Sequence, residues 1–390
     1  MSRELATLDP RSLVRPEVRR LRAYHLDQTP CRFKLDQNEV PWDLPRRLKD
    51  EVARRLAATD WARYPDFHGD ALRRGLGRLH GHPWQGVLVG NGSNELLGVA
   101  LEALAGPGRE VLSFAPTFGL YRMFGLRSGA TVRCLPPRSD LAIPFDELLA
   151  EVDRDPRRPV ILCSPNNPTG GALEPERVER LLDALEAPLL LDNAYGEFCR
   201  WDYRPLLDRH PHLLVFRTFS KAWSLGGLRL GYVLAHPELV EELIKVKLPY
   251  NLGHAGLVTG QVVLENAHVM HRRVTVLRTL RDRWAPALRR RGFEVFPSEG
   301  NYLLVRVDPE RIGLDVAGAR EGLAERGVLV RDVSHYPGLA DCMRVSVGSR
   351  RALRAVEQAL DELGTPIRGD FTRAQDRDQD RGQDPEEDAP

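Results

Sequence analysis

The sequence TFSKAWSLGGLRLGY occupies positions 218–232 and directly follows an apolar run at 213–216 that predicts a strand. Within it, Lys221 stands between small hydroxyl residues, and Arg229 follows eight residues later. A lysine amine forms a Schiff base with an aldehyde, while hydroxyls and a guanidinium bind phosphate. The stretch therefore suits a covalently held, phosphate-bearing cofactor, although a solvated lysine and arginine beside an ordinary Gly-rich turn would look the same.

The composition indicates a globular protein. The chain has 390 residues, of which 42% are hydrophobic, and this length is sufficient for two domains. Its formal net charge is only +1, with basic and acidic residues interspersed, which argues against nucleic acid as a partner. We therefore expect small-molecule partners.

The cysteines and the apolar runs bear on compartment and membrane contact. The five cysteines are scattered without a CxxC pair, which fits a reducing cytosol better than a disulfide scaffold or a metal site. The N-terminal segment is charged and lacks the apolar core of a signal peptide, and no apolar run approaches about 20 residues. We expect a cytoplasmic protein without a membrane span or a bound metal.

Strand-like and helix-like segments alternate through the first two thirds of the chain. This alternation predicts an α/β fold with a mostly parallel sheet and helices on both faces. The predicted strands are 87–89, 111–114, 131–135, 160–163, 189–191, 213–216 and 231–235, and the predicted helices between them include 96–105, 118–129 and 174–186. Polar clusters follow several of these strands, and ligands of such sheets collect at strand carboxyl ends. We therefore expect one shared site there.

Changes in composition divide the chain into four parts. We expect an N-terminal arm at 1–43 that belongs to the smaller domain, a large domain at 44–255 and a small α+β domain at 256–365. Residues 366–390 are rich in Asp, Gln, Arg and Glu, and this composition predicts a disordered tail.

The residues at the strand ends match what pyridoxal phosphate needs from a protein, which is an imine lysine, an acid, a donor, a stacking ring and a phosphate cup. Lys221 is the imine lysine, and Asp192 is a natural partner for the ring nitrogen. Asn167 and Tyr195 are candidates to hold the 3-oxygen, and Phe118 or Tyr121 to stack on the ring. The candidate cup is Ser93, Asn94, Thr218, Ser220 and Arg229. Taken singly, each has a structural alternative: a helix cap, a turn residue or a core aromatic.

Several motifs together give the chain a resemblance to the fold-type-I, pyridoxal-phosphate-dependent aminotransferases of class I/II, specifically the histidinol-phosphate aminotransferases. The resemblance extends from about residue 12 to about residue 365. It rests on LDQNE at 35–39, RYP at 63–65, GSNE at 92–95, PTFGLY at 116–121, SPNNPTG at 164–170, DNAY at 192–195, SK and Arg229 at 220–229, LVRD at 329–332, and MRVSVG at 343–348. The SPNNPTG and SK…R motifs are the most specific of these.

The resemblance implies a role for each matching residue. Lys221 would be the Schiff-base lysine and proton shuttle, and Asp192 would pair with the pyridinium. Asn167 and Tyr195 would hold the 3-oxygen, and Phe118 would stack on the ring. The cup residues named above would bind the phosphate, with Tyr64 reaching it from the other subunit of a homodimer. The implied substrate residues are Tyr24, Asn38, Arg331 and Arg344, of which the two arginines would take a carboxylate or a phosphate.

The implied activity is transfer of an amino group between L-histidinol phosphate and 2-oxoglutarate or glutamate in histidine biosynthesis. An aromatic or broad-range aminotransferase and a threonine-phosphate decarboxylase fit the same pocket arginines and stay open. A non-catalytic regulator would be expected to carry a basic DNA-binding segment, which the sequence does not show. Two positions depart from the family pattern: Asn193 stands where an acid is usual, and Phe118 where tyrosine is frequent.

Overall fold

In the computed structural model of the protein, residues 9–21, 23 and 29–364 are described. The chain divides into two compact units, residues 1–30 and 31–390. The described part of the first unit holds a 3₁₀ helix, η1 (Pro10–Leu13), and a single helical turn, α1 (Pro16–Arg19), whose first residue is a proline.

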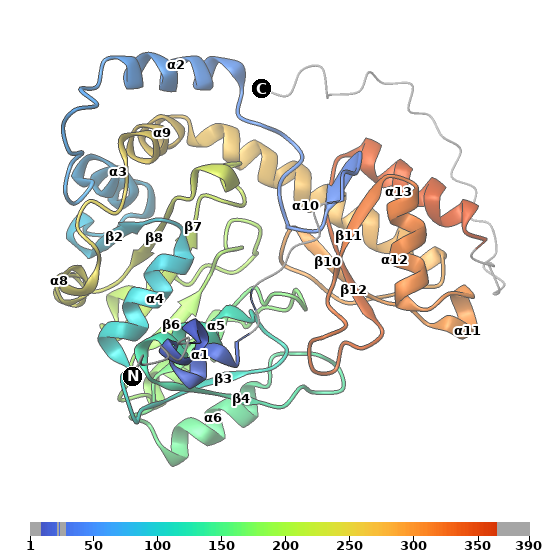
Figure 1. The fold of residues 1–390 in the computed structure, drawn as a ribbon, viewed down its shortest axis with the longest axis horizontal. Coiled ribbons are helices and arrows are strands. Elements are labelled where there is room, and N and C mark those ends of the chain that lie inside the picture. Colours follow the sequence, from blue (N-terminus) through green and yellow to red (C-terminus); the bar gives the residue numbers. More distant parts are fainter. Residues whose placement is uncertain (1–8, 22, 24–28, 365–390) are drawn as a thin grey trace, which may run out of the picture. The chain divides into compact units, whose positions relative to one another are not determined.

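The larger part of the second unit is built around a seven-stranded sheet (Figure 1). Its order is β2-β8-β7-β6-β5-β3-β4, and all its neighbouring strands pair in parallel except those that pair with β8. The strands are β2 (Val87–Gly90), β3 (Glu110–Phe114), β4 (Thr131–Leu135), β5 (Val160–Cys163), β6 (Leu189–Asp192), β7 (Leu213–Thr218) and β8 (Gly231–Leu234). The predicted α/β class is confirmed.

Helices cover both faces of this sheet, as the alternation of buried residues along one strand shows. Leu189 and Leu191 of β6 belong to one core cluster, whereas Leu190 between them belongs to another. The second cluster includes residues of α4 (Ser93–Leu104), α5 (Leu120–Ser128) and α8 (Pro237–Val246). The first includes residues of α3 (Asp70–His80), α6 (Phe145–Arg154), α7 (Pro175–Ala184), α9 (His254–Glu265) and α10 (Ala267–Arg290).

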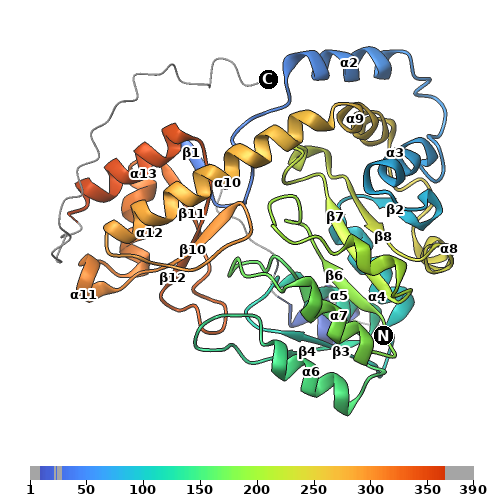
Figure 2. The ribbon, with the colours of Figure 1, turned by 180° about the vertical axis from the view of Figure 1, so that it is seen from behind.

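A five-stranded sheet, in the order β1-β11-β12-β10-β9, forms the second part of this unit. Its strands are β1 (Phe33–Leu35), β9 (Glu294–Val295), β10 (Tyr302–Arg306), β11 (Val328–Asp332) and β12 (Cys342–Ser346). The helices α11 (Pro309–Ile312), α12 (Val316–Glu325) and α13 (Arg350–Glu362) accompany them. Figure 2 shows the long helix α10 extending between the two sheets, and α2 (Arg46–Ala57) packs against α9.

The pairing of β1 with β11 has a consequence for the site. Residues 33–35 run parallel to 328–330 and thereby join the small sheet, although almost 300 positions separate the two strands. The chain that follows β1 contains Asn38, whose backbone N–H donates to the Ser346 hydroxyl of β12. A segment from near the N-terminus is therefore held beside the small sheet.

Three of the longer helices were missing from the sequence interpretation, namely α6, α8 and α9. In α6, the buried side chains of Phe145, Leu148 and Val152 lie three and four residues apart, so the signal was present. The helix predicted at 96–105 begins three residues earlier, at Ser93. Within the described ranges, no helix is both long and apolar enough to cross a membrane.

Candidate active site

A cavity of about 130 Å³ lies where β5, β6 and β7 end and α4 begins. It is lined by all ten residues that the family resemblance implied for the cofactor within one subunit, whereas Tyr121, the alternative stacking ring, does not line it. The lining residues are Ser93, Asn94, Phe118, Cys163, Asn167, Asp192, Ala194, Tyr195, Thr218, Ser220, Lys221 and Arg229. The prediction that separate strand ends converge on one site is therefore supported by the geometry.

Lys221 follows the end of β7, and its ammonium nitrogen donates to the carbonyl oxygen of Gln37 at 2.7 Å. Burial lowers the pKa of this lysine to about 7, and the positive charges of Arg344 and Arg229 act in the same direction. A substantial fraction of the amine is consequently neutral near pH 7. A neutral amine can attack a carbonyl or accept a proton.

Asp192 ends β6 and is 4% exposed. One carboxylate oxygen accepts a 2.7 Å hydrogen bond from the Tyr121 hydroxyl, and the other accepts one from the backbone N–H of Ala194 at 3.2 Å. None of the ion pairs of the described residues involves this carboxylate, and burial raises its pKa. A buried carboxylate without a cationic neighbour favours a cationic ligand.

The opposite end of the lining is suited to an anion. Ser93 and Asn94 occupy the first turn of α4, and the residue before the helix, Gly92, provides no side-chain cap for its free N–H groups. The guanidinium of Arg229 donates to the Ser220 hydroxyl at 3.0 Å. A side chain at Gly92 would meet this guanidinium at 2.9 Å, so the backbone approaches Arg229 closely only because glycine stands there.

The groups that line the cavity fit pyridoxal phosphate. The cavity combines an anion cup, a buried carboxylate that has no ion pair among the described residues, and a lysine with a lowered pKa. The cofactor carries a phosphate, a basic ring nitrogen and an aldehyde. Phe118 contributes an aromatic ring to the same lining. Among the residues that the structure describes, no group of three or more His, Cys, Asp or Glu side chains could hold a metal ion.

Two further predicted residues contact the lining rather than forming part of it. Arg344 of β12 donates to the side-chain oxygen of Asn167 at 2.5 Å and to the carbonyl oxygen of Asp36 at 2.6 Å. Asn38 donates its side-chain N–H to the Tyr195 hydroxyl at 2.9 Å. The small sheet and the segment that follows β1 therefore contact the two residues that were proposed to hold the 3-oxygen of the cofactor.

Three predicted residues do not join this group. Arg331 lies on β11 as the Cα partner of Arg344 and is half-buried, but it does not line the cavity. Tyr64 is 78% exposed and stacks on Tyr250, with 4.5 Å between the ring centroids. Tyr24 lies outside the described residues.

The sequence did not predict the hydrogen bond from Tyr121 to Asp192, nor that Cys163 and Ala194 line the cavity. Cys163 is the last residue of β5, so its position at a strand end was an available signal. The hydrogen bond from Tyr121 depends on the packing of α5 against the sheet, which no local pattern encodes.

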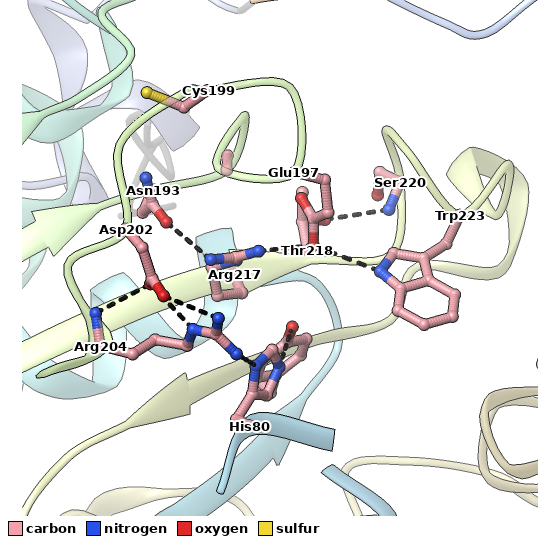
Figure 3. A network of polar contacts seen from close by, with 12 residues as sticks. His80, Asn193, Glu197, Cys199, Asp202, Arg204, Arg217, Thr218, Ser220 and Trp223 are labelled. Carbon is pink, nitrogen blue, oxygen red and sulfur yellow. Dashed lines mark hydrogen bonds and ion pairs between the residues drawn. The ribbon is translucent and has the colours of Figure 1, made fainter. Parts of the chain in front are cut away.

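A buried polar network lies next to the lining residues (Figure 3). The guanidinium of Arg217 donates to the side-chain oxygen of Asn193 at 2.8 Å and pairs with the Glu197 carboxylate at 3.0 Å. Glu197 also accepts from the indole N–H of Trp223, and Asn193 donates to the carbonyl oxygen of Ser164. Asn193, which departs from the family pattern, is thus part of a network that connects Ser164, Arg217 and, through Glu197, Trp223.

Comparison with known proteins agrees with this geometry. The family model for aminotransferase class I and II matches residues 32–363. A histidinol-phosphate aminotransferase of Ralstonia nicotianae is 38% identical over 345 residues, which cover 86% of this chain and 90% of that protein. A histidinol-phosphate aminotransferase of Chlorobaculum parvum is 35% identical over 346 residues, covering 87% and 95% respectively.

The fold also matches solved structures. One is the crystal structure of histidinol-phosphate aminotransferase from Sinorhizobium meliloti in complex with pyridoxal-5'-phosphate. Its TM-score is 0.75 with 24% sequence identity, and the match covers 87% of this chain and 92% of that one. At this identity the likeness establishes the fold.

Proposed function

The chain belongs to the aminotransferase class I and II family, and we propose that it transfers an amino group between L-histidinol phosphate and the 2-oxoglutarate/glutamate pair in histidine biosynthesis. The observation that carries this proposal is one cavity holding both Lys221, with a pKa of about 7, and Asp192, a buried carboxylate that has no ion pair among the described residues. The curated relatives point to the substrate, and the cavity supports the chemistry.

The cofactor is pyridoxal 5'-phosphate, which supplies an aldehyde that takes up the amino group and a ring that accepts the electron pair left at the substrate carbon. Lys221 would form the covalent link, and Asp192 would hold the ring nitrogen protonated. Asn167 and Tyr195 would bind the 3-oxygen, and Phe118 would stack on the ring. The residues that would hold the phosphate are Ser93, Asn94, Thr218, Ser220 and Arg229.

Lys221 also moves the proton in the transfer step. With the cofactor bound, the Lys221 amine would take a proton from the amine-bearing carbon of the substrate and would return it on the cofactor side. This task needs a base whose pKa lies near the working pH, and burial beside Arg344 and Arg229 brings the lysine into that range. The hydrogen bond to Gln37 keeps the amine directed at one place in the lining.

The two arginines of the small sheet are proposed to select the substrates. Arg344 and Arg331 face each other across the β11–β12 pair, so two guanidinium groups come from neighbouring strands. A guanidinium fork binds carboxylate and phosphate in the same bidentate manner, so the pair serves glutamate and histidinol phosphate in turn. Tyr24 and Asn38 are proposed as further substrate-pocket residues on the strength of the family resemblance alone.

A half-reaction tests the proposal. The purified protein, loaded with pyridoxal phosphate, is mixed with L-histidinol phosphate and no acceptor, and the visible absorbance of the cofactor is followed. We expect the absorbance to fall as one equivalent of oxo product per site forms, and 2-oxoglutarate to restore it. Phenylalanine and threonine phosphate serve as comparison donors. A faster response to phenylalanine, or release of CO2 from threonine phosphate, would contradict the assignment.

We also propose a homodimer in which Tyr64 of one copy completes the phosphate site of the other. Tyr64 stacks on Tyr250, which also contacts Phe67, and all three rings are exposed; such exposed aromatic groups favour association. Mixing inactive Lys221→Ala protein with Tyr64→Ala protein should produce hybrid dimers with one intact site. Recovery of activity on mixing supports the arrangement, whereas no recovery despite proven hybrids contradicts it.

A cytoplasmic location is proposed from the thiols. All five cysteines of the sequence are free, and three of them are buried. Free thiols persist in a reducing compartment. Localisation of a fluorescent fusion in the source cell tests this proposal, and a periplasmic or membrane signal would overturn it.

A further inference from the structure

Asn38 lies between the cavity and the small sheet. Its side chain is 0% exposed, and its φ of 54° is in the left-handed region, where asparagine is one of the few tolerated side chains. Two small-sheet contacts hold its backbone: its N–H donates to the Ser346 hydroxyl at 2.8 Å, and its carbonyl accepts from the Asn301 side chain at 3.0 Å. Asn38 is therefore held in one orientation before any ligand binds.

The hydrogen bonds determine which way the amide of Asn38 faces. A backbone N–H can only donate, so the Ser346 oxygen accepts from it and has its own proton to give elsewhere. That proton goes to the side-chain oxygen of Asn38, at 3.1 Å. The amide nitrogen then faces Tyr195, at 2.9 Å from its hydroxyl oxygen.

The orientation of the amide decides the role of the Tyr195 hydroxyl. An amide nitrogen can only donate, so the tyrosine oxygen accepts from Asn38 and keeps its own proton. Within the described part of the chain, no hydrogen bond takes up that proton. Tyr195 lines the cavity, so the direction left to its O–H bond is into the cavity.

We propose that Asn38 is a positioning residue for Tyr195, which accepts from the Asn38 amide and thereby presents its hydroxyl proton to an oxygen anion in the cavity. This inference rests on the proposed function, in which that anion is the 3-oxygen of the cofactor. It gives Asn38 a role toward the cofactor, in addition to the substrate-pocket role that the family resemblance implies. It also links the small sheet, through Ser346, to the cofactor end of the cavity.

Asn38→Asp is the matched test because aspartate keeps the shape and tolerates the left-handed backbone, but its carboxylate can only accept. The carboxylate accepts the Tyr195 proton, and the 3-oxygen loses one of its two proposed donors. A donor stabilises negative charge on that oxygen, so without it the bound cofactor holds its proton to higher pH. We expect the midpoint of the optical pH titration of bound cofactor to rise by about one to two units.

Three further variants complete the test. Tyr195→Phe removes the donor itself and should raise the midpoint by a similar amount. If Asn38 acts through Tyr195, the double variant Asn38→Asp/Tyr195→Phe should titrate as Tyr195→Phe does, because the effects are not additive. Asn266→Asp makes the same chemical change away from the cavity lining and should leave the midpoint where it is.

The outcomes separate this inference from the proposed function. If the unaltered protein binds no cofactor and shows no titration, the proposed function fails. If it titrates and Asn38→Asp titrates at the same pH, or if the double variant shifts by the sum of both single shifts, the role of Asn38 is overturned while the function stands. Should Asn38→Asp not fold, Asn38→Gly keeps the backbone and removes the amide, and an unchanged midpoint there also overturns the role.

Discussion

Two adjacent pairs of residues show how the cavity differs from the protein next to it. Asp192 and Thr218 line the cavity, whereas their chain neighbours Asn193 and Arg217 do not and bond to each other. Both regions bury charge. Arg217 is paired with Glu197, while the Asp192 carboxylate has hydrogen bonds but no ion pair among the described residues. A buried charge without its counter-charge indicates a ligand site, and a paired one indicates a structural part.

Among the changes considered, replacing Lys221 in the cavity should reduce activity the most. Lys221→Ala removes the covalent link and the base together, so we expect turnover to fall by at least about 10⁴-fold. The cofactor should still bind through the anion cup, detected by its fluorescence or by equilibrium dialysis. Full activity in this variant would contradict the assignment of the lysine.

Replacing Arg217 of the paired network should lower the stability of the protein rather than change its catalytic chemistry. The side chains of Arg217 and Glu197 are 9% and 6% exposed, so Arg217→Met leaves a buried carboxylate alone and should lower the free energy of unfolding by about 3–5 kcal/mol. Chemical denaturation measures this change.

A second variant sharpens the test of the pair. In Arg217→Met/Glu197→Gln the unpaired charge is gone, so the loss of stability should be smaller than in Arg217→Met alone. A double variant that loses as much as the sum of its two single variants would show that the pair is not the reason for the loss.

The contrast between the two sides also explains what the sequence could predict. Lys221, Asp192 and Asn167 stand at the ends of apolar strands or in turn motifs, and parallel strands bring their ends to one edge. These residues could be found from local patterns. The partners Tyr121 and Asn38 reach the site from α5 and from the segment after β1, and Asn38 is 157 positions from Tyr195. Their contacts arise from packing across long sequence separations, which local patterns do not contain.

Asp192→Asn should have an intermediate effect. The amide preserves the shape and the hydrogen bond with Tyr121 but removes the negative charge that holds the ring nitrogen protonated. Hydrogen bonds to charged groups contribute about 1.5–3 kcal/mol, so we expect kcat to fall by roughly 10- to 100-fold. Asn193→Ala is the control from the paired side. It should reduce stability and change kcat less than Asp192→Asn does, and the reverse order would contradict the assignment.

The smallest expected effect concerns the pH dependence of cofactor capture. Only the neutral amine of Lys221 reacts with an aldehyde, and with a pKa of about 7 its neutral fraction rises about tenfold from pH 6 to pH 8 and then levels off. An ordinary lysine, with a pKa of 10.5, would gain about a hundredfold over the same range and reach no plateau. Stopped-flow mixing of cofactor-free protein with pyridoxal phosphate measures this profile, with a blocked free lysine as the reference amine. The lowered pKa of Lys221 has a second consequence, because in the unfolded chain this lysine keeps its proton up to about pH 10.5. The free energy of unfolding of the cofactor-free protein should therefore rise between about pH 7 and pH 10.5, and Lys221→Met should abolish that rise. A capture rate that climbs without levelling off would show that the lysine is not held in the buried, cation-lined position that distinguishes the cavity from the paired network.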